Sequence, residues 1–282
     1  MAKETSKLSE VKIPSLKGNQ ITILYILLIV AAFLIGSLYT KVSFLEKNGS
    51  TTTNTQAENT AAQQPQGQQP APVKVDINAI KDLFKKDFIK FGDANRKVLF
   101  VEVVDPSCPF CQVAAGKNPE LNKEMGGNFV LVEDGGTYIA PVVEIKKLVD
   151  EGKASFVFLY QNGHGNGELA TKALYCAHDQ GKFWQAHDKL MTNDGYNLIN
   201  NEVKNDKANT GKLVDFLTGS VDSSALKSCL ESGKYDDALS TAIQAASSLG
   251  VNGTPGFFVN ETNFAGAYNW TDMKSVVDEA LK

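Results

Sequence analysis

The sequence is short of the residues on which several classes of site depend. It contains only 4 cysteines and 3 histidines among 282 residues. Four cysteines are too few for a fold built on disulfides, although they are enough for two pairs in an oxidising compartment. The formal net charge of −4 gives no broad basic face, so nucleic acid is not expected as a partner. The glycine-rich stretch NGHGNG at 162–167 lacks the lysine and the serine or threonine of a phosphate-binding loop and is predicted to be a flexible loop.

One long apolar run lies near the N-terminus, at residues 21–38 (ITILYILLIVAAFLIGSL), and contains no charged residue. As a helix it would reach about 27 Å, close to the hydrocarbon thickness of a bilayer. Four lysines precede the run and two follow it closely, which favours a cytoplasmic N-terminus and an extracytoplasmic body. We therefore expect a cytoplasmic tail at 1–20 and a transmembrane anchor at 21–39. A cleaved signal peptide and a buried core helix are the alternatives.

The next segment is rich in Thr, Asn, Gln and Pro and has almost no large apolar residues. Such a segment cannot bury enough surface to offset its chain entropy, so we expect a flexible linker at 40–75.

Hydrophobic periodicity after the linker predicts a mixed α/β domain at 76–282. Helices are predicted at 76–91, 168–178, 182–191, 212–217, 223–231, 235–249 and 271–281. Strands are predicted at 97–104, 129–132 and 155–160, within GTPGFFVN (253–260), and around 264–268. Because most of the helices fall between the third and fourth of these strands, the sheet is expected to be opened by a helical insertion at about 161–249.

Two cysteines separated by two residues, Cys108 and Cys111, follow the strand at 97–104. Pro109 suits the first position of a helix, which places Cys108 at a helix N-terminus where a thiolate is stabilised. In Cys-X-X-Cys motifs the pKa of the first thiol falls to roughly 3.5–7. Cys111 lies about one turn later, shielded and able to close a disulfide with Cys108. An exposed nucleophile beside a buried partner is typical of thiol–disulfide exchange.

A structural zinc site and an inert crosslink are the alternatives for this pair. A structural zinc site usually shows a second close pair of ligands, whereas Cys176 and Cys229 are far apart in the sequence. The histidines also show no ligand spacing toward Cys108. We therefore expect no metal at this site.

The stretch FVEVVDPSCPFC resembles the first strand and active-site turn of thioredoxin-fold proteins, most closely the DsbA-like thiol:disulfide oxidoreductases. GTPGFFVN resembles their second signature, a Thr-Pro with a cis peptide bond that faces the active-site disulfide. The resemblance covers roughly 91–282 and implies a thioredoxin fold with a helical insertion subdomain. It also implies that the redox group is the Cys108–Cys111 disulfide itself, without a bound cofactor.

The resemblance assigns roles to individual residues. Cys108 would be the nucleophile, and Cys111 the resolving thiol. Glu102 matches the buried acid of the central strand, whose raised pKa would let it shuttle the Cys111 proton; the alternative is an outward-facing strand residue. Pro255 would carry the cis bond, or else be an ordinary trans proline in a turn, and Thr254 would offer main-chain groups to an extended substrate. Pro109 and Phe110 complete the substrate-binding turn.

One position departs from the family pattern. Strongly oxidising DsbA members have a histidine before the second cysteine, where this chain has Phe110. Phenylalanine supplies neither a positive charge nor a hydrogen bond to the thiolate. The resemblance therefore implies a Cys108 that is less acidic, and a disulfide that is less oxidising, than in the strongest oxidants.

The remaining cysteines, Cys176 and Cys229, both fall within the predicted helical insertion. In an exported domain they are most simply a structural disulfide, and some DsbA-like proteins carry such a second bridge. A relay pair that takes electrons from Cys108 and two buried free thiols are the alternatives.

These features together predict a membrane-anchored extracytoplasmic oxidoreductase that forms disulfides in reduced, exported polypeptides. By analogy with the family, its reoxidant would be a quinone-linked membrane protein of the DsbB or VKOR class. A reductase or isomerase using the same residues, a peptide-binding chaperone module and a metal chaperone are the alternatives.

Overall fold

The computed structural model of the chain describes residues 73–282. The predicted tail, the anchor at 21–39 and nearly all of the predicted linker lie outside these residues. Within residues 73–282, no helix is both long and apolar enough to cross a membrane.

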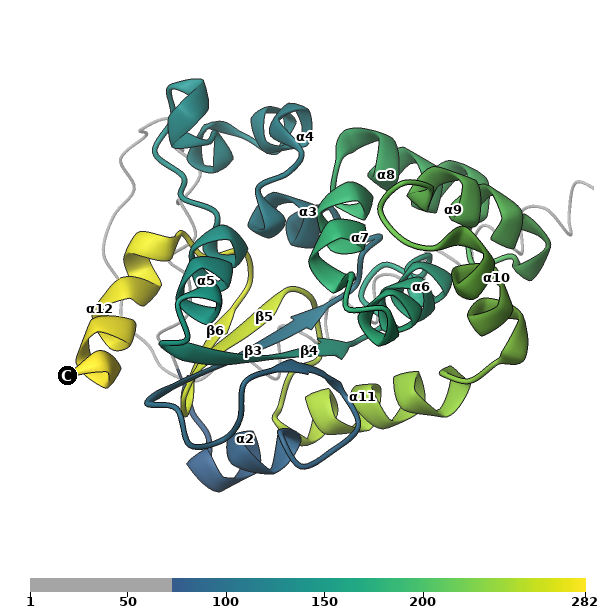
Figure 1. Ribbon diagram of the computed structural model, residues 1–282. Coiled ribbons are helices and arrows are strands. Elements are labelled where there is room, and N and C mark those ends of the chain that lie inside the picture. The colour runs from purple at the N-terminus through teal and green to yellow at the C-terminus, as the bar shows by residue number, and fades with distance from the viewer. Residues whose placement is uncertain (1–72) are drawn as a thin grey trace, which may run out of the picture. The chain divides into compact units, whose positions relative to one another are not determined.

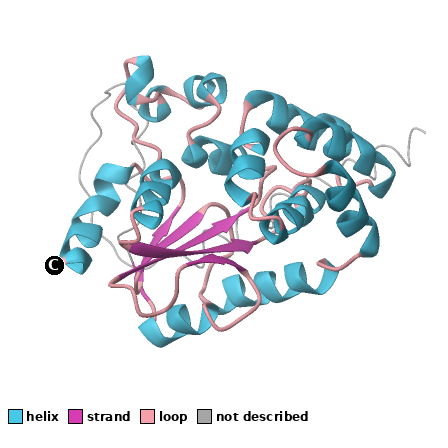
Figure 2. Ribbon diagram, viewed as in Figure 1, coloured by secondary structure: helices cyan, strands magenta, loops and turns pink. Residues whose placement is uncertain are grey.

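A six-stranded mixed sheet forms the centre of the described part (Figures 1 and 2). Its strands are β1 (Val73–Lys74), β2 (Ile89–Phe91), β3 (Val98–Val104), β4 (Ala154–Tyr160), β5 (Gly256–Val259) and β6 (Thr262–Ala265). Their order across the sheet is β1-β6-β5-β3-β4-β2. The pair β3–β4 is parallel, and all other pairs are antiparallel.

The strands β3 and β4 are buried at every position. Such strands read in a sequence as continuous apolar runs, because both faces of the sheet are covered. Figure 1 shows α2 (Ile77–Leu83) and α11 (Asp236–Ser248) on one face of the sheet, and α5 (Pro141–Asp150) and α12 (Trp270–Leu281) on the other. The candidate active-site turn follows directly after the central strand β3.

The helical insertion separates β4 from β5 in the chain. It contains α6 (Glu168–Asp179), α7 (Phe183–Leu190), α8 (Asn193–Asn197), the π-helical turn η3 (Leu198–Val203), the 3-10 turn η4 (Lys207–Asn209), α9 (Thr210–Leu217) and α10 (Ser223–Ser232). These elements form a group at one end of the sheet (Figure 1). The insertion predicted to reach residue 249 ends earlier, since α11 returns to the sheet and packs against β4.

Two helices between β3 and β4 were missing from the sequence prediction. These are α4 (Pro119–Glu124) and α5, and each begins with a proline at its first turn, as α3 (Pro109–Ala115) also does. Proline suits this position because its fixed φ and missing N–H cost nothing there. Pro119 and Pro141 are thus the sequence signals for these two helices.

Several predicted boundaries were wrong. The helix predicted at 76–91 ends at Leu83, and Ile89–Phe91 instead pairs with β4 as the edge strand β2. Apolar residues spaced three apart fit a helix. Here the first of them lie in the helix and the last of them lie in the strand. The strand predicted at 129–132 is replaced by two 3-10 turns, η1 (Gly127–Phe129) and η2 (Val132–Asp134). The strand expected around 264–268 lies at Thr262–Ala265.

The linker was also predicted to extend too far. Val73–Lys74, placed in the linker by composition, forms β1 and pairs with β6. Main-chain hydrogen bonds to an existing edge strand hold this segment, and composition carries no sign of them.

Candidate active site

Cys108 occupies the N-cap position of α3, with extended φ and ψ of −76° and 127°. Its carbonyl oxygen accepts hydrogen bonds from the N–H groups of Cys111 and Gln112, each at 3.1 Å. Pro109 is the first helical residue. The first turn of α3 therefore presents its N–H groups on the same side as the Cys108 thiol.

The Cys108 thiol is made acidic by its surroundings. The pKa of Cys108 is lowered from its usual value of 9.0 to about 6, chiefly by a hydrogen bond with the Cys111 thiol and also by one with Thr254. Burial acts in the opposite direction, and the N–H groups of Phe110 and Cys111 lower the pKa further. Cys108 was predicted to be exposed, but only 6% of its surface is accessible. Only a small part of the Cys108 side chain is therefore in contact with solvent.

Cys111 has the opposite character. Its side chain is fully buried, and its Sγ accepts a hydrogen bond from the N–H of Asp105 at 3.5 Å. Burial, and then the interaction with Cys108, raise the pKa of Cys111 well above its usual range. The motif thus combines one thiol that ionises readily with a neighbour that holds its proton.

The second sequence signature meets the first across the sheet. The Thr254–Pro255 peptide bond is cis. The Cys108 thiol donates to the main-chain oxygen of Thr254 at 3.4 Å. Antiparallel pairing of β3 with β5, in which Val103 faces Gly256, brings these two segments together.

Glu102 lies in the middle of β3, between Phe158 of β4 and Phe257 of β5. Only 1% of its surface is exposed, so the alternative of an outward-facing residue is wrong. Within residues 73–282, neither of its carboxylate oxygens accepts a hydrogen bond. Burial raises the pKa of Glu102 from 4.5 to about 8, which makes it a neutral proton donor at neutral pH.

The face of the sheet on which Glu102 lies follows from its neighbours. Residues directly opposite on paired strands point to the same face, and Phe158 contacts Phe183 of α7 with ring centroids 5.4 Å apart. Glu102 therefore points to the face of the sheet that α7 covers. Cys111 lies in α3, and its Sγ accepts the N–H of Asp105, the residue that directly follows β3 and stands three positions after Glu102.

Phe110 presents an aromatic side chain to solvent beside Cys108. It is 41% exposed, and its ring packs edge-on against Phe129 at 5.9 Å. Phe129 packs in the same way against Tyr138 at 5.5 Å. The exposed ring of Phe110 therefore provides an apolar surface beside the Cys108 sulfur.

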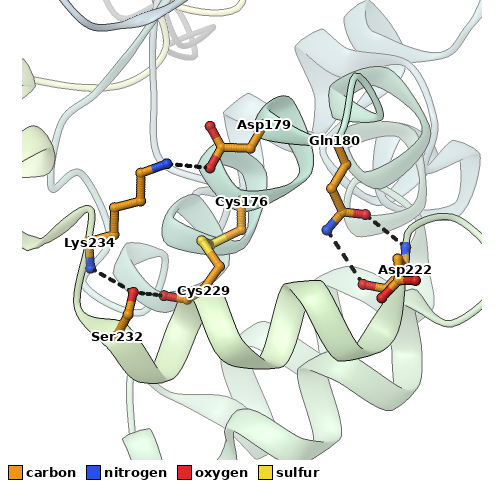
Figure 3. Close-up of a disulfide and its surroundings, with 7 residues drawn as sticks. All are labelled: Cys176, Asp179, Gln180, Asp222, Cys229, Ser232 and Lys234. Atoms are coloured by element: carbon orange, nitrogen blue, oxygen red, sulfur yellow. Dashed lines mark hydrogen bonds and ion pairs between the residues drawn. A yellow bond between two sulfur atoms is a disulfide. The ribbon is translucent and has the colours of Figure 1, made fainter.

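The remaining two cysteines form a disulfide with a Cα–Cα distance of 5.9 Å. It joins α6 to α10 within the helical group (Figure 3). The alternative of two buried free thiols does not apply to this pair. Beside the bridge, Asp179 of α6 forms an ion pair at 2.8 Å with Lys234, which lies just after the end of α10. Across residues 73–282, no group of three potential ligands is arranged to hold a metal ion.

Asp105 is the site residue that sequence reasoning missed. It is fully buried between β3 and Cys108, and its carboxylate accepts hydrogen bonds from the main chain of the glycine-rich loop at 162–167. This loop was predicted to be flexible, but it is fastened to the active-site turn. An aspartate between a buried strand and a Cys-X-X-Cys motif was the available signal, because a charge is rarely buried without partners.

The sequence model of the thioredoxin family matches residues 142–279, a range that includes Pro255 but not the Cys108–Cys111 motif. Among curated proteins, none matches the chain significantly. The structure is similar to that of alpha-DsbA1 from Wolbachia pipientis, with a TM-score of 0.50 and 16% identity, covering 69% of this chain and 91% of that one.

Two further solved structures are similar. BdbD from Bacillus subtilis, in its oxidised form, gives a TM-score of 0.49 and 18% identity over 76% of this chain and 99% of that one. A thioredoxin-like oxidoreductase from Silicibacter pomeroyi gives a TM-score of 0.46 and 21% identity, over 71% of this chain and 96% of that one. With its sheet order, its inserted helices and its cis Thr254–Pro255 bond, the chain has a thioredoxin-like fold, similar to that of alpha-DsbA1.

Proposed function

We propose that this protein is a thiol:disulfide oxidoreductase that forms disulfides in exported polypeptides through Cys108 and Cys111. The observation that carries the proposal is the contrast between the two thiols. Cys108 has a pKa lowered to about 6, and Cys111 has a pKa raised well above its usual range. Because Cys111 is fully buried, a substrate thiolate meets the disulfide at Sγ of Cys108. The low pKa of Cys108 then makes it the good leaving group when the mixed disulfide is resolved.

The reaction consists of two exchanges. A substrate thiolate attacks Sγ of Cys108 in the oxidised protein, forming a mixed disulfide and breaking the Cys108–Cys111 bond. The electron pair of that bond goes to Cys111, which takes up a proton. A second substrate thiolate then attacks the substrate sulfur of the mixed disulfide and releases Cys108 as a thiolate. The substrate is oxidised by two electrons, and the protein is left as the dithiol.

We assign Glu102 to the proton transfer. With a pKa of about 8 its carboxyl is protonated at neutral pH and can supply the proton that Cys111 needs as its sulfur is released. We assign Pro109, Phe110, Thr254 and Pro255 to substrate binding. Main-chain groups of Thr254 would pair with an extended substrate, while the exposed ring of Phe110 would contact apolar residues beside its cysteine.

The acidity of Cys108 favours oxidation as the direction of the reaction. A stabilised thiolate stabilises the reduced protein, which makes the disulfide a stronger oxidant. A pKa of about 6 lies between those of thioredoxin, roughly 7, and DsbA, roughly 3.5. The disulfide is accordingly expected to be an oxidant of intermediate strength.

The cellular setting belongs to the proposal on sequence grounds. The apolar run at 21–38 and the surrounding lysines support an anchored protein whose catalytic domain lies outside the cytoplasm. The dithiol must then pass two electrons to a reoxidant, for which a quinone-linked membrane protein of the DsbB or VKOR class is the candidate. Tethering would raise the local concentration of the two proteins.

The second candidate is a reductase or isomerase with the same residues and the opposite electron flow. Phe110 favours it, because the histidine of the strongest oxidants is missing from this position. The proposed function needs the disulfide form to react with reduced substrates, whereas the second candidate needs the dithiol form to react with oxidised ones.

The test uses the purified full-length chain in its oxidised form and a reduced, unfolded model protein. Formation of substrate disulfides should be stoichiometric for the wild type and absent for Cys108→Ser. In its reduced form, Cys111→Ser should accumulate a mixed disulfide through Cys108 with an oxidised model protein, since no resolving thiol remains. The double variant Cys176→Ser/Cys229→Ser is the control and should retain activity. Equal activity of Cys108→Ser and wild type in a refolding assay would instead indicate a chaperone.

A further inference from the structure

Asp105 holds both active-site cysteines through its main chain. Its carbonyl oxygen accepts a hydrogen bond from the N–H of Cys108 at 2.9 Å. Its own N–H donates to Sγ of Cys111 at 3.5 Å. The position of this one residue therefore fixes where both sulfurs lie at the end of β3.

The Asp105 side chain reaches in another direction, to the loop at 162–167. Its Oδ2 accepts three loop N–H groups, and its Oδ1 accepts the N–H and hydroxyl of Ser107. The distances are 3.1 Å for Gly163, 2.8 Å for His164, 3.2 Å for Gly165, and 2.9 Å and 2.6 Å for Ser107 N and Oγ. The Ser107 hydroxyl in turn accepts the N–H of Asn166 at 3.1 Å. Hydrogen bonds to a carboxylate are stronger than those between neutral groups, so these bonds hold the loop firmly against the active-site turn.

The fastened loop lies directly against Thr254. A Cβ atom at Gly163 would be 2.0 Å from Oγ1 of Thr254, so this position has room only for glycine. At Gly167 a Cβ atom would be 1.9 Å from Oδ1 of Asp105. These glycines are therefore required for close approach at both contacts and do not make the loop flexible.

The contacts form a closed ring through the active site. The Cys108 thiol meets the Thr254 carbonyl, the Thr254 side chain meets Gly163, Gly163 is bound by Asp105, and Asp105 is bound to Cys108. We propose that Asp105 is a positioning residue that, through the glycine loop, sets how the Thr254–Pro255 segment faces Cys108 for polypeptide substrates. This inference rests on the proposed function and names the residue that prepares the same site for chain-like substrates.

The ring should matter for a polypeptide and little for a small thiol. A polypeptide must lie along Thr254 while it presents its sulfur to Cys108, and a small displacement of that segment costs rate steeply. Dithiothreitol needs access only to Cys108. A change in the ring should therefore separate the two rates, whereas loss of folded protein lowers both together.

The test compares Asp105→Asn and Gly163→Ala in the full-length chain. The asparagine amide keeps one acceptor but turns an NH2 group toward donors, so at least one set of bonds breaks. The alanine methyl displaces Thr254 from the other side of the ring. We expect each variant to lose about tenfold or more in the rate with reduced polypeptide and less than about threefold with dithiothreitol. In the double variant, the fold-loss in the rate with reduced polypeptide should be smaller than the product of the two single fold-losses. Both substitutions disturb the same contact between the glycine loop and Thr254.

Gly92→Ala is the matched control. Its Cβ atom would be 2.2 Å from the hydroxyl oxygen of Ser155, at the opposite end of β4, so the side-chain clash is similar but far from the cysteines. The φ of +76° at Gly92 adds backbone strain, which makes this control at least as disruptive to the fold as Gly163→Ala. This variant should lower the melting temperature and leave the ratio of the two rates at the wild-type value. If Asp105→Asn does not fold, Gly163→Ala carries the test alone.

The outcomes separate the inference from the proposed function. Equal losses with both substrates, or no loss with either, in folded Asp105→Asn or Gly163→Ala would overturn the role of Asp105. Failure of the wild type to exchange with either substrate would instead refute the proposed function. A selective loss with the polypeptide alone supports both.

Discussion

The sulfur of Cys108 lies 3.4 Å from the main-chain oxygen of Thr254, which follows it by 146 residues in the chain. Pairing between β3 and β5 creates this contact, since Val103 and Gly256 are opposite each other in the ladder. The reactive turn and the cis-proline segment therefore depend on the same two strands. On the proposed function, a substrate cysteine bound to Cys108 would lie beside Thr254.

The first prediction concerns the ionisation of Cys108. In the reduced protein the thiolate absorbance near 240 nm should rise with a midpoint near pH 6, the value to which the Cys108 pKa is lowered. Cys111→Ala should move the midpoint upward, because the hydrogen bond from Cys111 is the largest cause of the lowered pKa. A midpoint near 9 in the wild type would contradict this account.

The same ionisation affects the stability of the reduced protein. A lowered folded-state pKa contributes stability that is fully present above the usual value of 9.0 and is lost as pH falls through about 6. The reduced form should therefore lose stability relative to the oxidised form between pH 9 and 6. Denaturant unfolding of both forms at several pH values measures this difference.

Glu102→Gln should change how stability depends on pH. Glu102 has a pKa raised from 4.5 to about 8, so between these values the unfolded state releases a proton that the folded state retains. Wild-type stability should fall with rising pH across this range by up to about 1.4 kcal/mol per pH unit relative to Glu102→Gln. Parallel curves for the two proteins would show that the carboxyl is ionised in the folded state.

Glu102→Gln should also slow the proton-coupled exchange at Cys111. Loss of a positioned acid or base costs on the order of 100-fold in rate, and an intervening water would reduce the loss. The ionisation of Cys108 provides the internal control, since its pKa has no contribution from Glu102. An unchanged rate across pH 5–9 would remove Glu102 from the mechanism.

Removal of the second disulfide should affect stability and leave the chemistry intact. The bond links residues separated by 53 positions, and closure of a loop of that length corresponds to about 4 kcal/mol. Cys176→Ser/Cys229→Ser should lose roughly this free energy of unfolding and keep its exchange rate at temperatures where it is folded. A loss of exchange in the folded double variant would favour a relay of electrons through this pair.

Phe110→His should make the disulfide a stronger oxidant. A histidine beside the thiolate adds a positive charge or a hydrogen bond, so the pKa of Cys108 should fall below 6. Each unit of that fall stabilises the reduced form and raises the reduction potential by about 30 mV. Phe110→Leu is the control for lost aromatic packing against Phe129 and should leave both quantities nearly unchanged.

The parts of the site that could be predicted were those with a local signal. Cys108, Cys111 and the Thr254–Pro255 bond follow from short motifs, and β3 and β4 from runs that are apolar at all but one position each. The turns at 127–134 could not be foreseen, because the apolar residues there serve a bridge between Leu131 and Tyr138 instead of a strand. Apolar composition alone does not distinguish these two outcomes.

Asp105 was missed for a different reason. Its partners, Gly163 to Gly165, lie nearly sixty residues away, and their N–H groups carry no sequence signal. From the sequence alone, glycine residues in a loop suggest a flexible backbone. They indicate close approach only once the neighbouring chain is known, as at Gly163 beside Thr254.

The reduction potential of the Cys108–Cys111 pair tests the central claim most directly. The full-length chain would be equilibrated with mixtures of reduced and oxidised glutathione, with Cys176→Ser/Cys229→Ser measured alongside so that the signal is assigned to the active-site pair. A Cys108 pKa near 6, about one unit below that of thioredoxin, predicts a potential about 30 mV above thioredoxin's, at roughly −240 mV. A value at or below roughly −270 mV would contradict disulfide donation and would indicate a reductase.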